Sequence, residues 1–273
     1  MSTFSVPTLA DMTAQGQTPE VLFWVGCAGS FDDRAKRITK AIARILHHCE
    51  VPFAVLGAEE SCTGDPAKRA GNEFLFQMQA AQNIAVLNGY EVKRIVTGCP
   101  HCFNVLKNEY PELGGNYEVM HHTQFIRDLI DQGRLKVADG NPFKGRRITF
   151  HDPCYLGRGN GEYAAPRDVL GTLDAELVEM RRCKQNGLCC GAGGAQMFKE
   201  AEKGNREVNH ERTEDVLDTN PQVVATGCPF CNTMMTDGVK NAERESSIDV
   251  KDIAELIAEA ADLIPTSPTQ DTP

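Results

Sequence analysis

The sequence predicts an α/β protein of two duplicated domains, each a small, mainly parallel sheet flanked by helices, related by pseudo-two-fold symmetry. Three observations predict this fold. Short apolar segments alternate with helical patterns along the chain. The apolar segments offer no polar face, as is typical of parallel strands covered by helices on both sides. Finally, the cysteines recur at nearly equal spacings in the two halves, which indicates an internal repeat.

The first half contains four strand patterns, each bounded by turn residues or leading into a helical pattern. The expected strands are Val21–Gly26, Phe53–Gly57, Arg94–Gly98 and residues 117–122. After the first strand we expect a helix whose apolar face carries Phe31, Ile38, Ile42, Ile45 and Leu46. Residues 68–87 are expected to form one long helix.

The second half restarts the pattern at residues 147–152, continues with strands at 175–180 and 222–227, and closes with a helix at 252–262. Gly, Asn and Pro gather at residues 138–145 and mark the expected linker. We therefore expect a mobile N-terminus at 1–18, a first cysteine-rich domain at 19–142, a second at 143–264, and a flexible tail at 265–273.

Composition narrows the function classes. Apolar residues make up 41% of the 273 residues and charged residues 24%, as in globular proteins. The net charge of -10 disfavours nucleic acid and an anionic membrane surface as partners. No apolar run reaches the roughly 18 residues of a membrane span, and the N-terminus lacks a secretory pattern, so we expect a cytoplasmic protein. Eleven cysteines in that compartment favour metal binding or thiol chemistry over disulfides.

Nine of the cysteines form a repeated lattice. In the first half they are Cys27, Cys62, Cys99 and Cys102, with 33 residues between Cys27 and the Ser61-Cys62 pair and 36 residues between that pair and Cys99. In the second half they are Cys154, Cys189, Cys190, Cys228 and Cys231, with gaps of 34 and 37 residues. Each position follows a predicted strand, and parallel strands end at one edge of a sheet, where α/β folds bind ligands. Only Cys49 and Cys183 lie outside the lattice.

Three kinds of site fit these thiols. The four cysteines of the first half match the four ligands of a structural zinc ion. The five cysteines of the second half exceed that need, and adjacent cysteines reach different irons of one cluster more readily than they chelate one ion. An iron–sulfur centre therefore fits best. Thiol exchange at the two CxxC pairs is the third alternative, although it leaves the other lattice cysteines without a role.

The short motifs around the cysteines resemble those of a known family. The second half resembles the cysteine-rich CCG domain of heterodisulfide reductase and its relatives in HDPCYLGR, CCGAGG and GCPFC. The first half is similar to iron–sulfur oxidoreductases linked to electron-transfer flavoprotein and acyl-CoA oxidation in SCTGDPAKRAGNEFLFQMQAAQN and CPHCFNVLKNEYPELGGNYEVMHH. The resemblance extends over roughly residues 20–263.

This resemblance implies one or two [4Fe–4S]-type clusters, the second of non-cubane type, with zinc as the alternative metal. The ligands of the second centre would be Cys154, Cys189, Cys190, Cys228 and Cys231. Those of the first centre would be Cys27, Cys62, Cys99 and Cys102. Ser61 stands where the family has the first cysteine of its doublet, and Thr63 where it has glycine. The first centre is then a four-thiolate cluster, a site that uses Ser61, or an empty site.

Three polar residues are expected beside the clusters. His151 and Asp152 precede Cys154 and either contact the centre or organise the turn at the end of the strand. His122 ends the fourth strand at the same sheet edge as the cysteines. Adjacent strand residues point to opposite faces, so only one of His121 and His122 can face the site. No catalytic residue is identified.

The resemblance implies an iron–sulfur electron-transfer subunit between a flavoprotein or ferredoxin-type partner and a quinone-linked acceptor. Related chains often carry a ferredoxin-like segment and sometimes a membrane haem segment. We therefore expect a ferredoxin-like subunit, electron-transfer flavoprotein or a membrane-anchored haem and quinone subunit as partners, with peripheral contact to the inner membrane through them. The alternatives are a disulfide reductase, the electron-carrying subunit of a lactate or glycolate oxidase, and a zinc-binding assembly protein without turnover.

Overall fold

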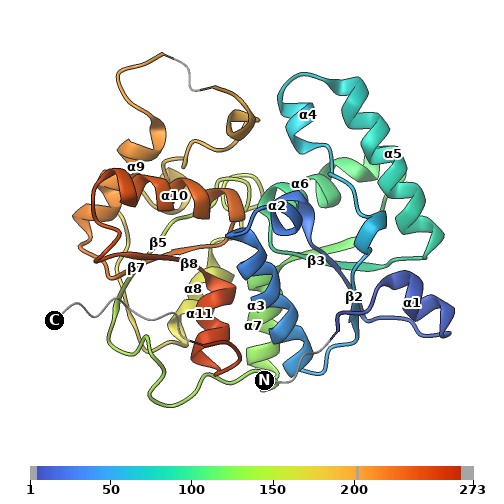
Figure 1. Ribbon diagram of the computed structural model, residues 1–273, viewed down its shortest axis with the longest axis horizontal. Helices are drawn as coiled ribbons and strands as arrows, with labels where there is room; N and C mark the ends of the chain where they lie inside the picture. Colours follow the sequence, from blue (N-terminus) through green and yellow to red (C-terminus); the bar gives the residue numbers. More distant parts are fainter. Residues whose placement is uncertain (1–4, 201–202, 266–273) are drawn as a thin grey trace.

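Each half of the chain forms a four-stranded parallel sheet. The computed structural model describes residues 5–200 and 203–265 (Figure 1). The first sheet has the order β2-β1-β3-β4, from Phe53–Ala54, Val21–Trp24, Arg94–Thr97 and Glu118–His121. The second has the order β6-β5-β7-β8, from Glu176–Leu177, Arg147–Phe150, Val223–Thr226 and Asp249–Asp252. The identical strand order confirms the predicted duplication and the α/β class.

Helices cover both faces of each sheet. In the first half they are α2 (Gly26–Phe31), α3 (Ala35–His48), α4 (Asp65–Arg69), α5 (Glu73–Gly89), α6 (Pro100–Asn104) and α7 (His122–Asp131). In the second half they are α8 (Ala164–Gly171), α9 (Val208–Asp218), α10 (Pro229–Asn241) and α11 (Ile253–Ala260). Strand β1 shows the consequence: Val21 and Phe23 enter one core cluster, while Leu22 and Trp24 enter another.

The two halves share one apolar core. Helices α3 and α7 of the first half pack against α11 and α8 of the second, and Figure 1 shows these four helices gathered between the sheets. At the edge of this core, the Arg34 guanidinium donates to both carboxylate oxygens of Glu255, each at 2.7 Å. Because α3 corresponds to α8 and α7 to α11, the contacts repeat under the pseudo-two-fold operation.

Several local expectations were wrong. The helix expected over residues 68–87 is divided into α4 and α5, because Gly71 takes a left-handed conformation with φ +84°. Phe31 was expected on an apolar face, but it ends α2 and is 83% exposed. The sequence patterns did not predict β8.

The expectation of a mobile N-terminus was wrong for part of residues 1–18. Residues Leu9–Ala14 form helix α1, and the Thr8 hydroxyl caps it by accepting from the Asp11 amide. Leu9 and Met12 are buried, and Thr8 forms a parallel bridge with Val55. Apart from residue 265, the expected tail lies outside the described residues. The domain boundary near residue 142 stays a prediction.

The shared core predicts that the two halves unfold together. Leu256 of α11 is fully buried in that core, so Leu256→Ala should lower the free energy of unfolding by about 2–5 kcal/mol. Trp24, the single tryptophan, is buried in the first half and reports on that half alone. Urea unfolding followed by Trp24 fluorescence should shift to lower urea although the substitution lies in the second half.

Leu75→Ala is the matched control, because Leu75 is 41% exposed on α5 and should change the midpoint little. An unchanged Trp24 transition in Leu256→Ala, with a separate early transition by circular dichroism, would show that the halves unfold independently.

Candidate metal centre between the two halves

The nine lattice cysteines all lie at the carboxyl ends of strands. In the first half, Cys27 follows β1 within α2, Cys62 lies in the connection after β2, and Cys99 follows β3 as the N-cap residue of α6. In the second half, Cys154 follows β5, Cys189 and Cys190 lie after β6, and Cys228 follows β7 as the N-cap residue of α10. Pro100 and Pro229 occupy the first helical turn after these caps, where a missing N–H costs nothing.

In the first half, four sulfur atoms converge. The Cys27 thiol interacts with Cys62, which holds the pKa of Cys27 well above its ordinary value and lowers that of Cys62 to about 7. The Cys99 sulfur interacts with Cys102 and raises its pKa, with burial adding to the effect. Negative charge on Cys27 and Cys62 also acts on Cys102, so the two pairs face one site.

In the second half, five sulfur atoms form a continuous series. Cys154 interacts with Cys189, and Cys189 with Cys190. The Cys190 and Cys231 sulfurs are 3.3 Å apart, and Cys231 in turn interacts with Cys228. All five thiols that were predicted as ligands therefore lie at one place.

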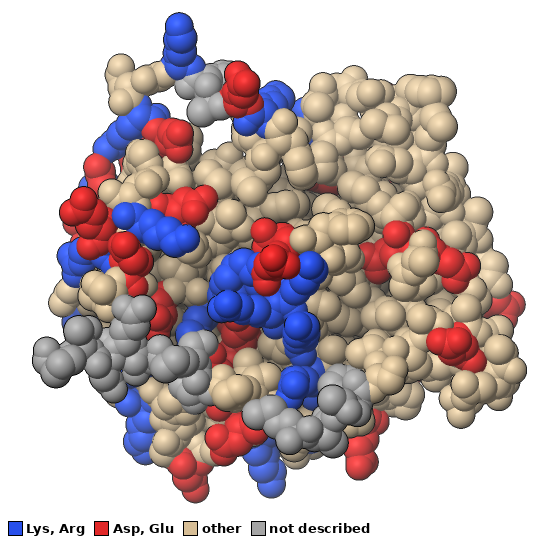
Figure 2. Space-filling model, in the orientation of Figure 1, with Lys and Arg blue, Asp and Glu red and all other residues tan. Residues whose placement is uncertain are grey.

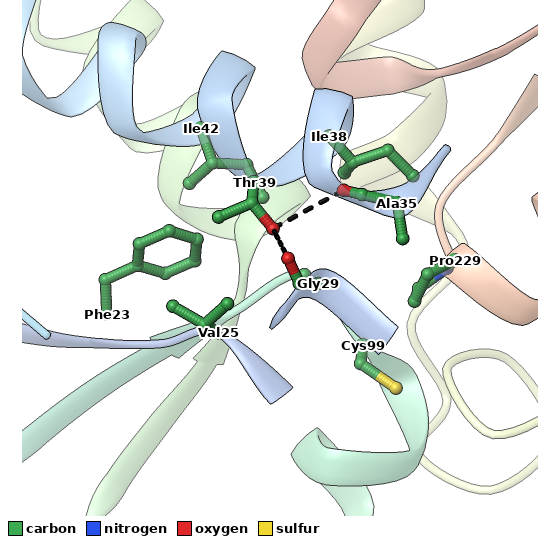
Figure 3. A pocket seen from close by; sticks show the side chains of 10 residues that line it. Phe23, Val25, Gly29, Ala35, Ile38, Thr39, Ile42, Cys99 and Pro229 are labelled. Carbon is green, nitrogen blue, oxygen red and sulfur yellow. Dashed lines mark hydrogen bonds between the residues drawn. The ribbon is translucent and has the colours of Figure 1, made fainter. Parts of the chain in front are cut away.

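The two sets meet at the pseudo-two-fold axis. The sulfur of Cys99 interacts with that of Cys228, its counterpart in the second half. The His101 ring packs against Phe230, again its counterpart, with ring centroids 5.3 Å apart, and against Tyr155 at 4.6 Å. Figure 3 shows Cys99 and Pro229 lining one small cavity, whose volume of about 10 Å³ reflects close packing between the halves.

These residues fit a thiolate-bound metal group. All eleven cysteines are free thiols, so no disulfide competes for the lattice. Cys228 and Cys231 are buried, and burial together with neighbouring sulfurs keeps their pKa values well above the ordinary range. A bound cation offsets that cost, because it deprotonates a coordinating thiol outright. Of the remaining two cysteines, Cys49 is buried at the end of α3 and Cys183 begins a short helical turn.

The structure aligns the Cys189–Cys190 doublet with a different pair of residues in the first half from the pair that the sequence motifs suggested. Cys62 and Cys189 are equivalent, because each interacts with the cysteine after the first strand of its half. Each also accepts an N–H···S bond from the glycine two residues later, from Gly64 at 3.4 Å and from Gly191 at 3.3 Å. Both glycines have left-handed φ values, +91° and +95°.

Thr63 therefore stands in the place of Cys190. Its hydroxyl contacts the Cys102 sulfur at 3.9 Å, as Cys190 contacts Cys231. The placement of Ser61 at the first doublet position and of Thr63 at the glycine was wrong. Ser61 lies one residue before the doublet, and its hydroxyl donates to Asn83 Oδ1 at 2.8 Å. Asn83 is itself fixed by donating to the Cys62 carbonyl and to the Tyr110 hydroxyl, both at 2.9 Å.

His151 belongs to the second site. A nitrogen of its ring and the sulfurs of Cys190 and Cys231 all lie within 4.8 Å of one another. The ring is fully buried, and burial, together with the nearby Arg212 guanidinium, lowers its pKa to about 3. Neutral imidazole is the form that metal sites use, as ligand or as hydrogen-bond donor.

Asp152 and His122 contact the segments around the cysteines rather than the sulfur atoms. The Asp152 carboxylate accepts two hydrogen bonds from Arg167, at 2.8 and 2.9 Å, and one from the Lys184 amide at 2.8 Å. It thereby joins the turn before Cys154 to the segment that leads to Cys189. His122 Nε2 lies 3.0 Å from Asp252 Oδ1 across the interface between the halves.

Sequence reasoning missed two arginines and one histidine contact. The sequence patterns assigned no role to Arg167 or Arg212, yet Arg167 binds Asp152 and Arg212 is fully buried. The His121 ring nitrogen Nε2 lies 3.0 Å from the Gly227 carbonyl oxygen, directly before Cys228. The alternation of β4 places His121 inward, which was a usable signal for this contact; no local pattern indicated the burial of Arg212.

Two clefts flank the first site. One has a volume of about 300 Å³ and is lined by Cys27, Phe31, Phe198 and Phe230 among others. The other, of about 340 Å³, is lined by Cys62, Leu75 and Phe198 among others. Phe198, from the loop after the Cys189–Cys190 doublet, borders both. The half-buried sulfurs of Cys27 and Cys62 are thus the ones reached from these clefts.

Fold and site together define a duplicated α/β protein with a thiol-rich candidate metal site where its halves meet. The chain belongs to the cysteine-rich (CCG) domain family, whose profile matches residues 21–107 and 148–236. The resemblance expected from the cysteine motifs is confirmed.

Three relatives illustrate the family. The chain is 45% identical over 251 residues to the EtfAB:quinone oxidoreductase of Syntrophomonas wolfei, covering 90% of this chain and 35% of that one. It is 45% identical over 256 residues to the probable iron-sulfur-binding oxidoreductase FadF of Bacillus subtilis, covering 93% and 36%. It is 34% identical over 251 residues to one subunit of the dihydromethanophenazine:CoB–CoM heterodisulfide reductase of Methanosarcina barkeri, covering 89% and 59%.

The chain thus spans about a third of the length of the first two relatives. Within the described residues, no helix combines the length and apolar character that a membrane crossing requires.

Proposed function

We propose that this protein holds two iron–sulfur centres and carries single electrons within an oxidoreductase. The observation that carries the proposal is the unbroken series of nine thiols across the facing edges of two sheets, joined at Cys99 and Cys228. Iron–sulfur centres supply one-electron transfer. The chain's own task is to hold the sulfurs, exclude water and set potentials through burial and N–H···S bonds such as that of Gly191.

The two centres are proposed to differ. The second set offers five thiols, more than one zinc ion takes, and its adjacent Cys189 and Cys190 suit a cluster of several irons. The first set offers four, because Thr63 occupies the fifth position. We therefore assign an ordinary four-thiolate [4Fe–4S] cluster to the first half and a five-thiolate, non-cubane type to the second.

The partner is proposed to dock near the first centre. Figure 2 shows few charged side chains over α4 and α5, although the chain carries a net charge of -10. The exposed apolar side chains there include Phe74 and Met78, at 75% and 55% exposure, and Leu75 of the same helix lines the cleft that reaches Cys62. Contiguous exposed apolar surface is typical of a protein interface.

The names of the relatives suggest what this interface serves. One is an EtfAB:quinone oxidoreductase and another an iron–sulfur-binding oxidoreductase. We infer an electron route from a flavoprotein or ferredoxin-type centre, on the same or a separate chain, toward a quinone-linked acceptor. A ferredoxin-like subunit, electron-transfer flavoprotein and a membrane-bound haem and quinone subunit are the proposed partners.

Removing a ligand of the second centre should remove its iron. Cys190→Ala and Cys228→Ala are each expected to lower iron and acid-labile sulfide by about one cluster per chain after anaerobic purification, because each takes away a buried thiolate. Cys49→Ala is the matched control, since Cys49 is equally buried but lies outside the lattice. Full iron in both lattice variants, or a colourless wild-type protein loaded with zinc, would refute the assignment.

The doublet register makes a second prediction. Thr63→Cys should give the first half a fifth thiol beside Cys102, so the electron paramagnetic resonance spectrum of the first centre should change toward that of the second. Ser61→Cys is the control, because the Ser61 side chain points to Asn83 and the new thiol should leave the spectrum unchanged. The opposite result, a change with Ser61→Cys and none with Thr63→Cys, would restore the register that the sequence words suggested.

A disulfide reductase is the second candidate function. The cleft of about 300 Å³ beside Cys27 is large enough for a small ligand, and its walls include the apolar side chains of Met197 and Phe230. A relative 34% identical to this chain belongs to a heterodisulfide reductase. A disulfide bound there would take up two electrons and two protons to give two thiols.

A donor assay separates the two functions. With reduced viologen as donor, an electron carrier should reduce an artificial acceptor but leave small organic disulfides unchanged. Viologen oxidation that depends on disulfide, and that is lost when Ala28→Trp fills the cleft, would establish the reductase instead. Iron and sulfide content of the variant should match that of the wild type.

A further inference from the structure

His151 lies between the second set of cysteines and a buried arginine. It directly follows β5, and its side chain is fully buried. The guanidinium Nε of Arg212 donates to His151 Nδ1 at 3.0 Å. Nε2 is buried and has no hydrogen-bond partner among the described residues. Nε2 is therefore the ring nitrogen available to donate a hydrogen bond toward the site of Cys190 and Cys231. The sulfurs of these cysteines and a nitrogen of the ring lie within 4.8 Å of one another.

Arg212 determines which tautomer the ring adopts. An arginine guanidinium keeps its protons in proteins, so Nε can only donate and His151 Nδ1 must accept. A neutral imidazole then carries its hydrogen on Nε2. This leaves Nε2 without a lone pair for iron, so the same hydrogen bond that orients the ring excludes His151 as a ligand through that atom.

Arg212 is itself held firmly. Its Nη1 donates to Asp215 Oδ2 at 3.0 Å and to the Arg182 carbonyl oxygen at 2.7 Å. The Asp215 carboxylate also accepts from Arg181 at 2.6 Å and from Arg182 at 2.7 Å. Three guanidinium groups thus share the Asp215 carboxylate, and that of Arg212 is fully buried beside the His151 ring.

We propose that His151 donates its Nε2–H to a sulfur of the second iron–sulfur centre and that Arg212 enforces this tautomer, so that the pair raises the reduction potential of the second centre. The inference rests on the proposed function. A reduced cluster carries more negative charge than an oxidised one, so a hydrogen bond and a nearby cation stabilise the reduced state. His151 is a positioning residue and not a ligand.

In the first half, Trp24 occupies the position of His151. Phe23 pairs with Val96 as Phe150 pairs with Ala225, and Trp24 and His151 each lie three residues before the first lattice cysteine of their half. The Trp24 indole Nε1 is buried and has no hydrogen-bond partner among the described residues. An indole nitrogen can only donate, so no neighbouring arginine is needed to fix its proton, and the tautomer enforced by Arg212 is a feature of the second centre.

Redox titration followed by electron paramagnetic resonance tests the proposal. His151→Leu should keep iron and sulfide but lower the midpoint potential of the second centre, with that of the first unchanged. His151→Gln retains an N–H donor and should bring the midpoint potential of the second centre most of the way back to the wild-type value. Arg212→Gln, like His151→Leu, should lower that potential below the wild-type value. An unchanged potential in His151→Leu with full iron overturns the inference; absence of iron and sulfide from the wild type overturns the proposed function instead.

A second measurement needs no variant of the site to fold. In wild-type protein labelled with ¹⁵N-histidine, pulsed electron paramagnetic resonance of the reduced second centre should show a weak coupling to a histidine nitrogen, as expected for a hydrogen bond. His210→Gln, a surface histidine on the same helix as Arg212, is the control and should leave that coupling in place. A strong coupling, as from a nitrogen bound to iron, or no coupling at all, overturns the inference.

Discussion

Parallel strand pairing is the constraint on which this molecule depends. It sends the three cysteine-bearing connections of each half to one edge of a sheet, although the cysteines are separated by more than thirty residues in the chain. The pseudo-two-fold arrangement then turns the two edges toward each other, so that Cys99 meets Cys228 and His101 meets Phe230. Neither half alone could place sulfur atoms on both sides of that axis.

Duplication kept the scaffold and let its contacts diverge. The N–H···S bonds from Gly64 and Gly191 are nearly identical, which shows that the backbone around the doublet is preserved. The side chains are not preserved: Thr63 contacts Cys102 where Cys190 contacts Cys231, and Trp24 occupies the position of His151. The two sites thus share one backbone plan but differ in the number of thiols and in the hydrogen-bond donors around them; such donors tune the potential of an iron–sulfur cluster.

The fold and the set of converging thiols could be predicted from the sequence, because apolar strand segments and repeated cysteine spacings are visible in the order of residues alone. It was insufficient where a residue's environment depends on distant partners. Strand β8 was missed because Lys251 looks solvated, yet it is buried and paired with Glu259 at 2.7 Å. The doublet register was misjudged because cysteine letters were matched, while the backbone equivalence of Gly64 and Gly191 was the better guide. Arg212 lay in an unremarkable polar helix.

The core shared by α3, α7, α8 and α11 has an evolutionary consequence. A lone half would present its α3 and α7 side, with residues such as Ile42 and Phe125, to water. A second copy of the same half can bury this apolar surface, because the interface of a two-fold dimer is self-complementary. The ancestor of this chain is therefore best pictured as a homodimer of one short polypeptide, and gene fusion freed each copy to specialise while the other kept the partnership intact.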